Sequence, residues 1–140
     1  MDCTICAIHK NKIPDILEIT NYWILRHSEI EKNCPGYLYL EPKAHIENLS
    51  ELSVECANEI GSLFKKSGDW VEKNFSPKKI YTVSISEKVP HLHFHIVPRY
   101  TDSNIGLDYI QLALTSKIPK TQFSDLQFQN LSSIISNYLL

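Results

Sequence analysis

Residues 90–99 of this 140-residue chain read Pro-His-Leu-His-Phe-His-Ile-Val-Pro-Arg, and this segment is the strongest indication of structure in the sequence. Histidine alternates with apolar residues, and a proline bounds the run on each side. Alternation with a period of two is typical of a β-strand, because successive side chains point to opposite faces of a sheet. We therefore expect a strand over residues 91–97 that places His91, His93 and His95 on one face and apolar side chains on the other.

Three imidazoles on one face are poor material for a hydrophobic core, because every buried ring nitrogen needs a hydrogen-bond partner. They could still be structural histidines whose ring nitrogens are all satisfied. A second interpretation is that all three bind one metal ion, since histidines two apart on a strand can reach a single zinc. A third is a division of roles, with one imidazole as nucleophile, one as donor to a phosphate oxygen and one as a structural ligand.

The sequence on both sides of this run predicts more strands and two helices. Segments rich in β-forming or alternating residues predict strands at residues 16–19, 22–26, 37–40 and 79–86. Asn48 and Glu51 form a candidate capping box, after which apolar residues recur at helical spacing up to Asn74-Phe75. A second helix is expected after Ser124-Asp125. This order of elements predicts an α+β fold with an antiparallel sheet.

Composition limits the classes of protein to consider. A hydrophobic fraction of 43% and a charged fraction of 21% are ordinary for a globular protein. The length of 140 residues suits one domain, which we expect to span residues 1–140. The net charge is −2 and the lysines are scattered, which argues against polymeric nucleic acid as a partner. No apolar run is long enough for a membrane span, and Asp2-Cys3 does not resemble the start of a secretory signal. We expect a cytoplasmic protein with no membrane partner.

The four cysteines divide into a pair and two single residues. Cys3 and Cys6 form a C-x-x-C pair, whereas Cys34 and Cys56 stand alone. In a reducing compartment such a pair is more often a metal clamp or a redox pair than a structural disulfide. A metal clamp would need further ligands from elsewhere in the chain.

Together these segments resemble the histidine triad family. Residues 90–99 resemble its signature in the His-Leu-His-Phe-His form, with Pro-Arg following. Residues 3–8 and the following Ile13-Pro14 resemble its N-terminal Cys-x-x-Cys segment, and residues 35–46 resemble its strand ending in Pro-Lys-x-His-Ile. The resemblance extends over about residues 3–100. It implies an antiparallel sheet of about five strands with two main helices, commonly assembled as a two-fold homodimer.

The zinc-containing branch of that family implies a structural metal site. In that branch the two cysteines, the histidine of Pro-Lys-x-His and the first triad histidine hold zinc. Transferred to this sequence, the ligands are Cys3, Cys6, His45 and His91. This would be a closed tetrahedral set with no open position for substrate. The alternative is that the cysteines are merely reduced thiols and that His45 caps the helix after it.

The resemblance also implies the chemistry of the other two histidines. His93 matches the histidine that attacks the α-phosphate of a nucleotide, forming a covalent nucleotidyl-imidazole that water or another acceptor resolves. An imidazole suits this step because its ordinary pKa lies near neutrality, so a nucleophilic nitrogen is available without a separate base. His95 matches the third histidine, which donates to the phosphate oxygens. The implied substrate is a purine nucleotide conjugate, either a dinucleoside polyphosphate or a nucleoside phosphoramidate, with no metal in the chemical step.

Other residues are assigned to the substrate by position. Glu29 falls where the family places a carboxylate on the ribose hydroxyls, although it could be a solvated surface residue. Ile5 and Ile8 could line a base pocket or simply belong to the core. The stretch 80–89 departs from the family because it has no Asn and no Gly. Its candidate phosphate donors are Ser84, Ser86 and Lys88, each of which could instead face solvent.

Two further functions remain open. The departures before the triad would suit a non-catalytic nucleotide-binding or scaffold protein. A zinc hydrolase, in which the triad itself holds a catalytic metal, is the other. Removal of zinc separates the zinc hydrolase from the histidine-nucleophile enzyme. A structural zinc contributes stability and leaves the chemistry of the folded protein intact, whereas a catalytic zinc is needed for the reaction itself.

Overall fold

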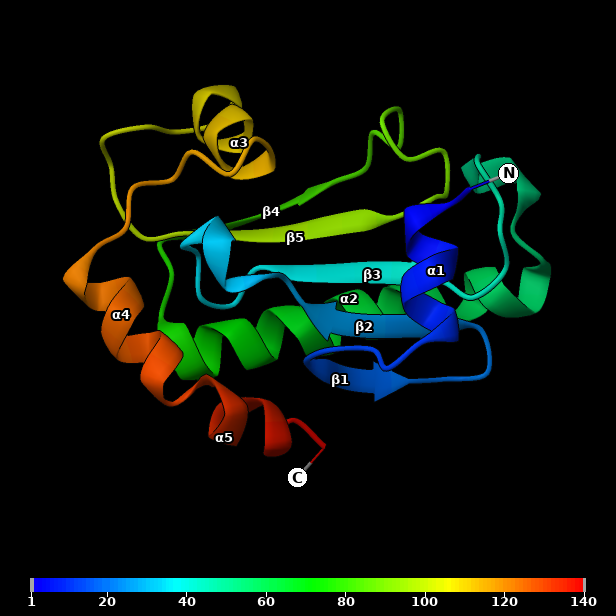
Figure 1. The fold of residues 1–140 in the computed structure, drawn as a ribbon, viewed down its shortest axis with the longest axis horizontal. Helices are drawn as coiled ribbons and strands as arrows, with labels where there is room; N and C mark the ends of the chain where they lie inside the picture. The colour runs from blue at the N-terminus through cyan, green and yellow to red at the C-terminus, as the bar shows by residue number, and fades with distance from the viewer. Residues whose placement is uncertain (1, 140) are drawn as a thin grey trace.

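The computed structural model describes residues 2–139, which contain a five-stranded antiparallel sheet with the strand order β1-β2-β3-β5-β4 (Figure 1). The strands are β1 (Ile16–Ile19), β2 (Trp23–His27), β3 (Leu38–Pro42), β4 (Lys79–Val83) and β5 (Phe94–Arg99). Each pair of neighbouring strands runs antiparallel. The predicted α+β fold with about five antiparallel strands is confirmed.

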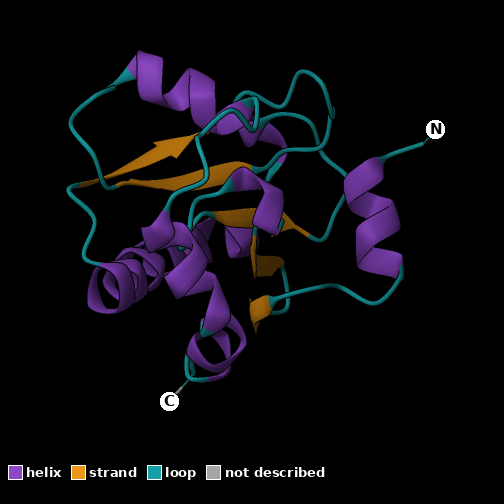
Figure 2. Ribbon diagram, turned by 60° about the vertical axis from the view of Figure 1, so that its left-hand side comes forward, coloured by secondary structure: helices purple, strands orange, loops and turns teal. Residues whose placement is uncertain are grey.

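Helices cover both faces of this sheet. They are α1 (Thr4–Lys10), α2 (Val54–Phe75), α3 (Leu107–Leu114), α4 (Gln122–Gln129) and α5 (Leu131–Ser136), with short 3₁₀ turns η1 (Ile30–Lys32) and η2 (Leu49–Glu51). α2, α4 and α5 pack on one face and α3 on the other. Figure 2 shows α1, beside the N-terminus, and the C-terminal helices on opposite sides of the sheet. Among residues 2–139, no helix has both the length and the apolar composition needed to cross a bilayer.

The long helix is confirmed, but it begins later than its capping box predicts. Asn48 and Glu51 do make the reciprocal capping bonds, yet the element they cap is the 3₁₀ turn η2. Ser53 caps α2, because its hydroxyl accepts the backbone N–H three residues further on at 3.1 Å. The helix then runs to Phe75, where the apolar spacing places its end.

The structure contains more helices than the two main ones predicted. Asn130 separates α4 from α5, where the sequence predicts one continuous helix after Ser124-Asp125. α1 and α3 are not indicated by the apolar pattern, because with 7 and 8 residues they make too few turns for a helical period to show.

The hydrophobic core lies between α2 and the sheet. The buried positions of α2 are Cys56, Leu63, Ser67, Trp70, Val71 and Phe75. They face the sheet residues Trp23, Leu25, Leu38, Leu40 and Ile96. Since side chains alternate along each strand, the residues between these core positions point away from α2. Those residues form the face on which α1 and α3 lie.

The strand that carries the triad begins later than its alternation predicts. β5 starts at Phe94, and its ladder with β4 ends where His95 lies opposite Val83. Before that point the backbone bonds to loops, and the N–H of Leu92 donates to the Ile46 carbonyl at 2.7 Å. The predicted strand is therefore wrong for residues 91–93.

A left-handed turn leads into β3 and provides a test of the fold. Gly36 has φ +84°, and a Cβ on it would lie 2.9 Å from Cδ2 of Phe75. We expect Gly36→Ala to lower the free energy of unfolding by about 1–3 kcal/mol, from backbone strain and the close contact. The control is Gly61→Ala, at an exposed position of α2 where a Cβ would meet nothing within 4 Å. It should raise the free energy of unfolding by about 0.5–1 kcal/mol. Chemical denaturation measures both, and a Gly36→Ala variant as stable as wild type would contradict the expectation.

Candidate active site

Side chains from neighbouring strands form a row on the face of the sheet away from α2. In the strand register, Tyr39 of β3 pairs with Arg26 of β2 and with His95 of β5. Val83 of β4 pairs with His95 and continues the row. α1 and α3 lie over opposite ends of this face (Figure 1). The row of side chains therefore lies between these two helices.

His91 leaves this row and turns toward the N-terminal cysteines. Its Nδ1 lies 3.4 Å from Sγ of Cys3 and 3.5 Å from Sγ of Cys6. Its Nε2 lies 2.9 Å from the carbonyl oxygen of Pro42. A carbonyl only accepts, so Nε2 carries the proton and the lone pair of Nδ1 faces the two sulfur atoms. Burial lowers the pKa of His91, which keeps this ring neutral and able to ligate.

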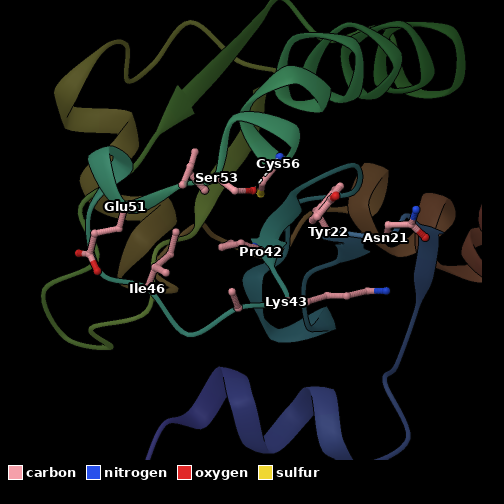
Figure 3. Close-up of a pocket in the computed structure, with 10 residues that line it drawn as sticks. Asn21, Tyr22, Pro42, Lys43, Ile46, Glu51, Ser53 and Cys56 are labelled. Carbon is pink, nitrogen blue, oxygen red and sulfur yellow. Dashed lines mark hydrogen bonds between the residues drawn. The ribbon is translucent and has the colours of Figure 1, made fainter.

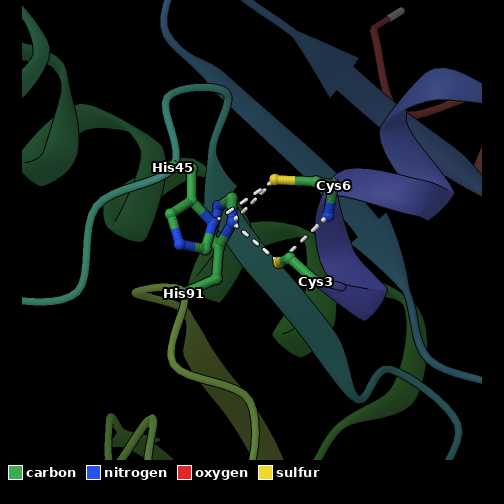
Figure 4. A group of neighbouring side chains, drawn as sticks. All are labelled: Cys3, Cys6, His45 and His91. Carbon is green, nitrogen blue, oxygen red and sulfur yellow. Dashed lines mark hydrogen bonds between the residues drawn. The ribbon is translucent and has the colours of Figure 1, made fainter. Parts of the chain in front are cut away.

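His45 completes a group of four side chains that could hold a metal ion (Figure 4). The ligand atoms of Cys3, Cys6, His45 and His91 all lie within 4.8 Å of one another. Tetrahedral zinc with ordinary Zn–S and Zn–N bonds places sulfur and nitrogen about 3.5 Å apart. The Cys6–His45 separation is 3.4 Å, and those from His91 are 3.4 and 3.5 Å. The group therefore fits zinc, and His93 and His95 are not members of it.

The backbone carbonyl and N–H of His93 are both hydrogen-bonded to serine hydroxyls. Ser84 donates through its hydroxyl to the His93 carbonyl at 2.8 Å, and Ser86 Oγ accepts the His93 N–H at 3.2 Å. The ring Nδ1 donates to the carbonyl oxygen of His91 at 2.7 Å. Because that carbonyl can only accept, the proton sits on Nδ1 and the lone pair is on Nε2. This is the protonation state that a nucleophilic imidazole needs.

His95 stands beside His93, with 4.9 Å between the ring centroids. Its Nδ1 lies 2.8 Å from the hydroxyl of Tyr37. Burial, with smaller contributions from His93 and Lys32, lowers the pKa of His95 to about 3. The ring is therefore neutral at physiological pH, and it carries one donor and one acceptor nitrogen.

Glu29 lies beside the same row, where it contacts Tyr39. Its carboxylate is exposed at the start of η1, and the Tyr39 hydroxyl donates to its two oxygens at 3.0 and 3.1 Å. A carboxylate oxygen has two lone pairs, so both oxygens can accept further hydrogen bonds. The remaining predicted substrate residues lie on α1 and on the loop before the triad. Ile5 is buried and Ile8 half-buried on α1, and Lys88 is exposed on the loop before the triad.

A buried charge network next to the row was not predicted. Glu41 accepts from Nε and Nη2 of Arg26 at 2.9 Å each, and His9 Nε2 lies 2.9 Å from the same carboxylate. Burial opposes ionisation, but the hydrogen bonds from His9 and Arg26 lower the pKa of Glu41 overall. Arg26 also covers the ring of Tyr39 at 4.6 Å. The signal in the sequence was a charged residue inside each of two apolar strands.

A separate pocket lies next to the loop that carries His45, one of the four candidate metal ligands Cys3, Cys6, His45 and His91 (Figure 3). It is lined by the turn between β1 and β2, the loop after β3 and the start of α2, including Tyr22, Lys43 and Cys56. None of the triad histidines lines it. It is therefore distinct from the row that contains His95.

Comparison with known proteins relates this fold to others. A family model described as the HIT domain matches residues 16–102. An adenosine 5′-monophosphoramidase of Schizosaccharomyces pombe is 30% identical over 104 residues, which cover 71% of this chain and 75% of that protein. A crystal structure of a HIT family protein from Bacillus subtilis is 25% identical, with a TM-score of 0.66 and coverage of 97% and 96%. A zinc-bound histidine triad family protein from Mycobacterium smegmatis is 17% identical, with a TM-score of 0.63 and coverage of 97% of each chain.

The low pKa of His95 gives a direct prediction. Because burial disfavours the charged imidazolium, the ring should not protonate until the pH approaches about 3. In protein labelled with ¹⁵N-histidine, the His95 ring nitrogens should keep the chemical shifts of a neutral imidazole from about pH 8 to about pH 5. A midpoint between about 6 and 7 would mean that His95 is solvated and that the packing around it is wrong.

Proposed function

The chain belongs to the HIT domain family, and from that premise we propose that it is a nucleotide hydrolase or nucleotidyl transferase. The reaction takes place at the α-phosphate of a purine nucleotide conjugate, with His93 as nucleophile. The observation that carries this proposal is the 2.7 Å hydrogen bond from His93 Nδ1 to the His91 carbonyl. It leaves the lone pair on Nε2, beside the neutral imidazole of His95.

The reaction proceeds in two displacements. Nε2 of His93 attacks the α-phosphorus, a P–N bond forms, and the bond from phosphorus to the leaving group breaks. His95 donates a hydrogen bond to the phosphate oxygens as negative charge develops on them. Water or another acceptor then attacks the same phosphorus, the P–N bond breaks and His93 is regenerated. The proton that the acceptor loses balances the proton that the leaving group takes up, by exchange through solvent. No metal ion takes part in either step.

The row of side chains suggests how the nucleotide lies. Glu29 is exposed and already oriented by Tyr39, which suits a role on the 2′ and 3′ hydroxyls of ribose. Ser86, whose hydroxyl accepts from the His93 N–H and keeps its own proton, and Lys88 would contact the phosphate. Ser84 would act indirectly, because its hydroxyl already donates to the His93 carbonyl. Ile5 and Ile8 of α1 would line the base. The phosphoramidase relative supports a nucleoside phosphoramidate as substrate, with a dinucleoside polyphosphate as the second class.

Zinc has a structural role in this proposal. Cys3, Cys6, His45 and His91 would hold it, and all of them are used as ligands, so no coordination position is left for substrate. The ion contributes folding free energy by joining α1 to the sheet. The zinc-bound relative supports this assignment, as does the fit of the sulfur–nitrogen separations. Free thiols suit a protein that works in the reducing cytoplasm. By the family resemblance, we also propose that the protein assembles as a homodimer.

The zinc proposal is tested by elemental analysis and calorimetry of cysteine variants. Wild-type protein should contain about one zinc per chain, and Cys6→Ser should lose it and melt at a lower temperature, because a structural site stabilises the fold directly. Cys56→Ser is the matched control, since this thiol lies outside the ligand group and should leave the zinc content unchanged. The proposal would be refuted if wild-type protein contained no metal, or if removing the metal left its melting temperature unchanged.

The nucleophile is tested by asparagine substitutions. His93→Asn lacks the nucleophilic lone pair, so turnover of an adenosine phosphoramidate should fall by about three or more orders of magnitude while nucleotide affinity hardly changes. His95→Asn should keep partial activity, because an amide can still donate to a phosphate oxygen. Steady-state kinetics and titration calorimetry give both quantities. Persistent turnover in the His93→Asn variant would exclude His93 as the nucleophile. A wild type that is inactive on phosphoramidates and dinucleoside polyphosphates would favour the interpretation as a scaffold protein.

A further inference from the structure

We propose that Tyr37 is a positioning residue that fixes the proton of His95 on Nε2. Its hydroxyl donates to Nδ1 of His95, so that Nε2–H is the group presented to a phosphate oxygen. This inference rests on the proposed function, and it deepens that function by naming the residue that sets the donor.

The direction of the hydrogen bond follows from the surroundings of the phenol. Tyr37 is fully buried, and within residues 2–139 its hydroxyl bonds only to Nδ1 of His95, at 2.8 Å. If Nδ1 carried the proton and donated to the phenol oxygen, the phenol proton would be buried without an acceptor. An unpaired buried donor is costly, so the phenol donates and Nδ1 accepts.

Neither partner changes protonation near neutral pH. Burial raises the pKa of Tyr37, which therefore keeps its proton. Burial also lowers the pKa of His95 to about 3, so a second ring proton is not available. A neutral imidazole whose Nδ1 accepts must carry its proton on Nε2. Within residues 2–139 the His95 ring is bonded through Nδ1, and Nε2 is not among the buried polar atoms that lack a partner. Because His95 is only partly buried, Nε2 is open to a ligand.

The phenol is held in place by groups outside the reacting pair. Its ring meets that of Tyr39 edge-on, with 5.5 Å between the centroids. The ammonium of Lys32 lies 5.4 Å from the centre of the Tyr37 ring. Lys32 is itself anchored, since it donates to the carbonyls of Ala113 and Leu114 at 3.2 and 3.1 Å. The end of α3 thus helps to fix the position of the hydroxyl.

Two neighbouring imidazoles therefore have opposite tautomers. His93 donates from Nδ1 to a carbonyl and keeps a lone pair on Nε2, whereas His95 accepts at Nδ1 and keeps a proton on Nε2. The first state suits attack on phosphorus and the second suits donation to its oxygens. With the opposite tautomer, His95 would direct a lone pair at a negatively charged oxygen. Tyr37 thus separates the roles of two otherwise similar side chains.

The experiment is ¹⁵N NMR of histidine-labelled protein, combined with kinetics. In the wild type without substrate, His95 should show a protonated Nε2 and an unprotonated Nδ1. Tyr37→Phe removes only the hydroxyl, so the two tautomers of His95 should become mixed. For this variant kcat should fall by about 10- to 100-fold, with KM changed by less than about threefold, because a transition-state donor is weakened.

Tyr39→Phe is the matched control. It removes a hydroxyl from the same face of the sheet, but one that bonds to Glu29 instead of His95. Its His95 tautomer should remain that of the wild type, and its KM should rise as the orientation of Glu29 is lost. This contrast distinguishes loss of the specific hydrogen bond from a general effect of removing a tyrosine hydroxyl.

Three outcomes would overturn the inference. One is a wild-type His95 protonated on Nδ1, which can be read even if Tyr37→Phe fails to fold. Another is a folded Tyr37→Phe variant with wild-type kcat while the wild type is active, which would refute the positioning role and leave the proposed function intact. The third is a wild type inactive on every nucleotide conjugate, which would remove the proposed function and this inference together.

Discussion

The roles of the three histidines depend on one constraint: a neutral imidazole has a single donor and a single acceptor, so the partner of one nitrogen fixes what the other presents. The Pro42 carbonyl accepts a hydrogen bond from Nε2–H of His91, so the lone pair on Nδ1 faces the two cysteine sulfur atoms. The His91 carbonyl accepts a hydrogen bond from Nδ1–H of His93. His95 is bonded to a phenol instead of a carbonyl. Different neighbours thus give similar side chains different chemistry.

The same region joins α1 to the sheet in two ways. At the N-terminal end of α1, Cys3 and Cys6 lie next to His91 in the candidate metal-ligand group. At its C-terminal end His9 meets Glu41, which is 1% exposed and also pairs with Arg26. Breaking a buried ion pair typically costs about 3–5 kcal/mol, because the remaining charge is left without a partner. This network therefore holds both the helix and the ring of Tyr39 that Arg26 covers.

The sequence predicts the sheet well because alternation and β-forming residues report directly on strand faces. Through the family resemblance it predicts four candidate metal ligands, and the structure brings these four side chains together. It does not predict the start of β5, since hydrogen bonds from distant loops override local alternation there. It also misses Glu41 with Arg26, and the bond from Tyr37 to His95, because pairing across strands is set by register and not by neighbours in the chain.

The proposed mechanism requires a covalent nucleotidyl intermediate on His93, which mass spectrometry can detect. Wild-type enzyme would be mixed with an adenosine phosphoramidate and quenched during turnover with denaturant at alkaline pH, where the P–N bond survives. Intact mass should then show one added nucleotidyl group, and peptide mapping should place it on His93. Turnover without any adduct, or an adduct on another residue such as His95, would contradict the account.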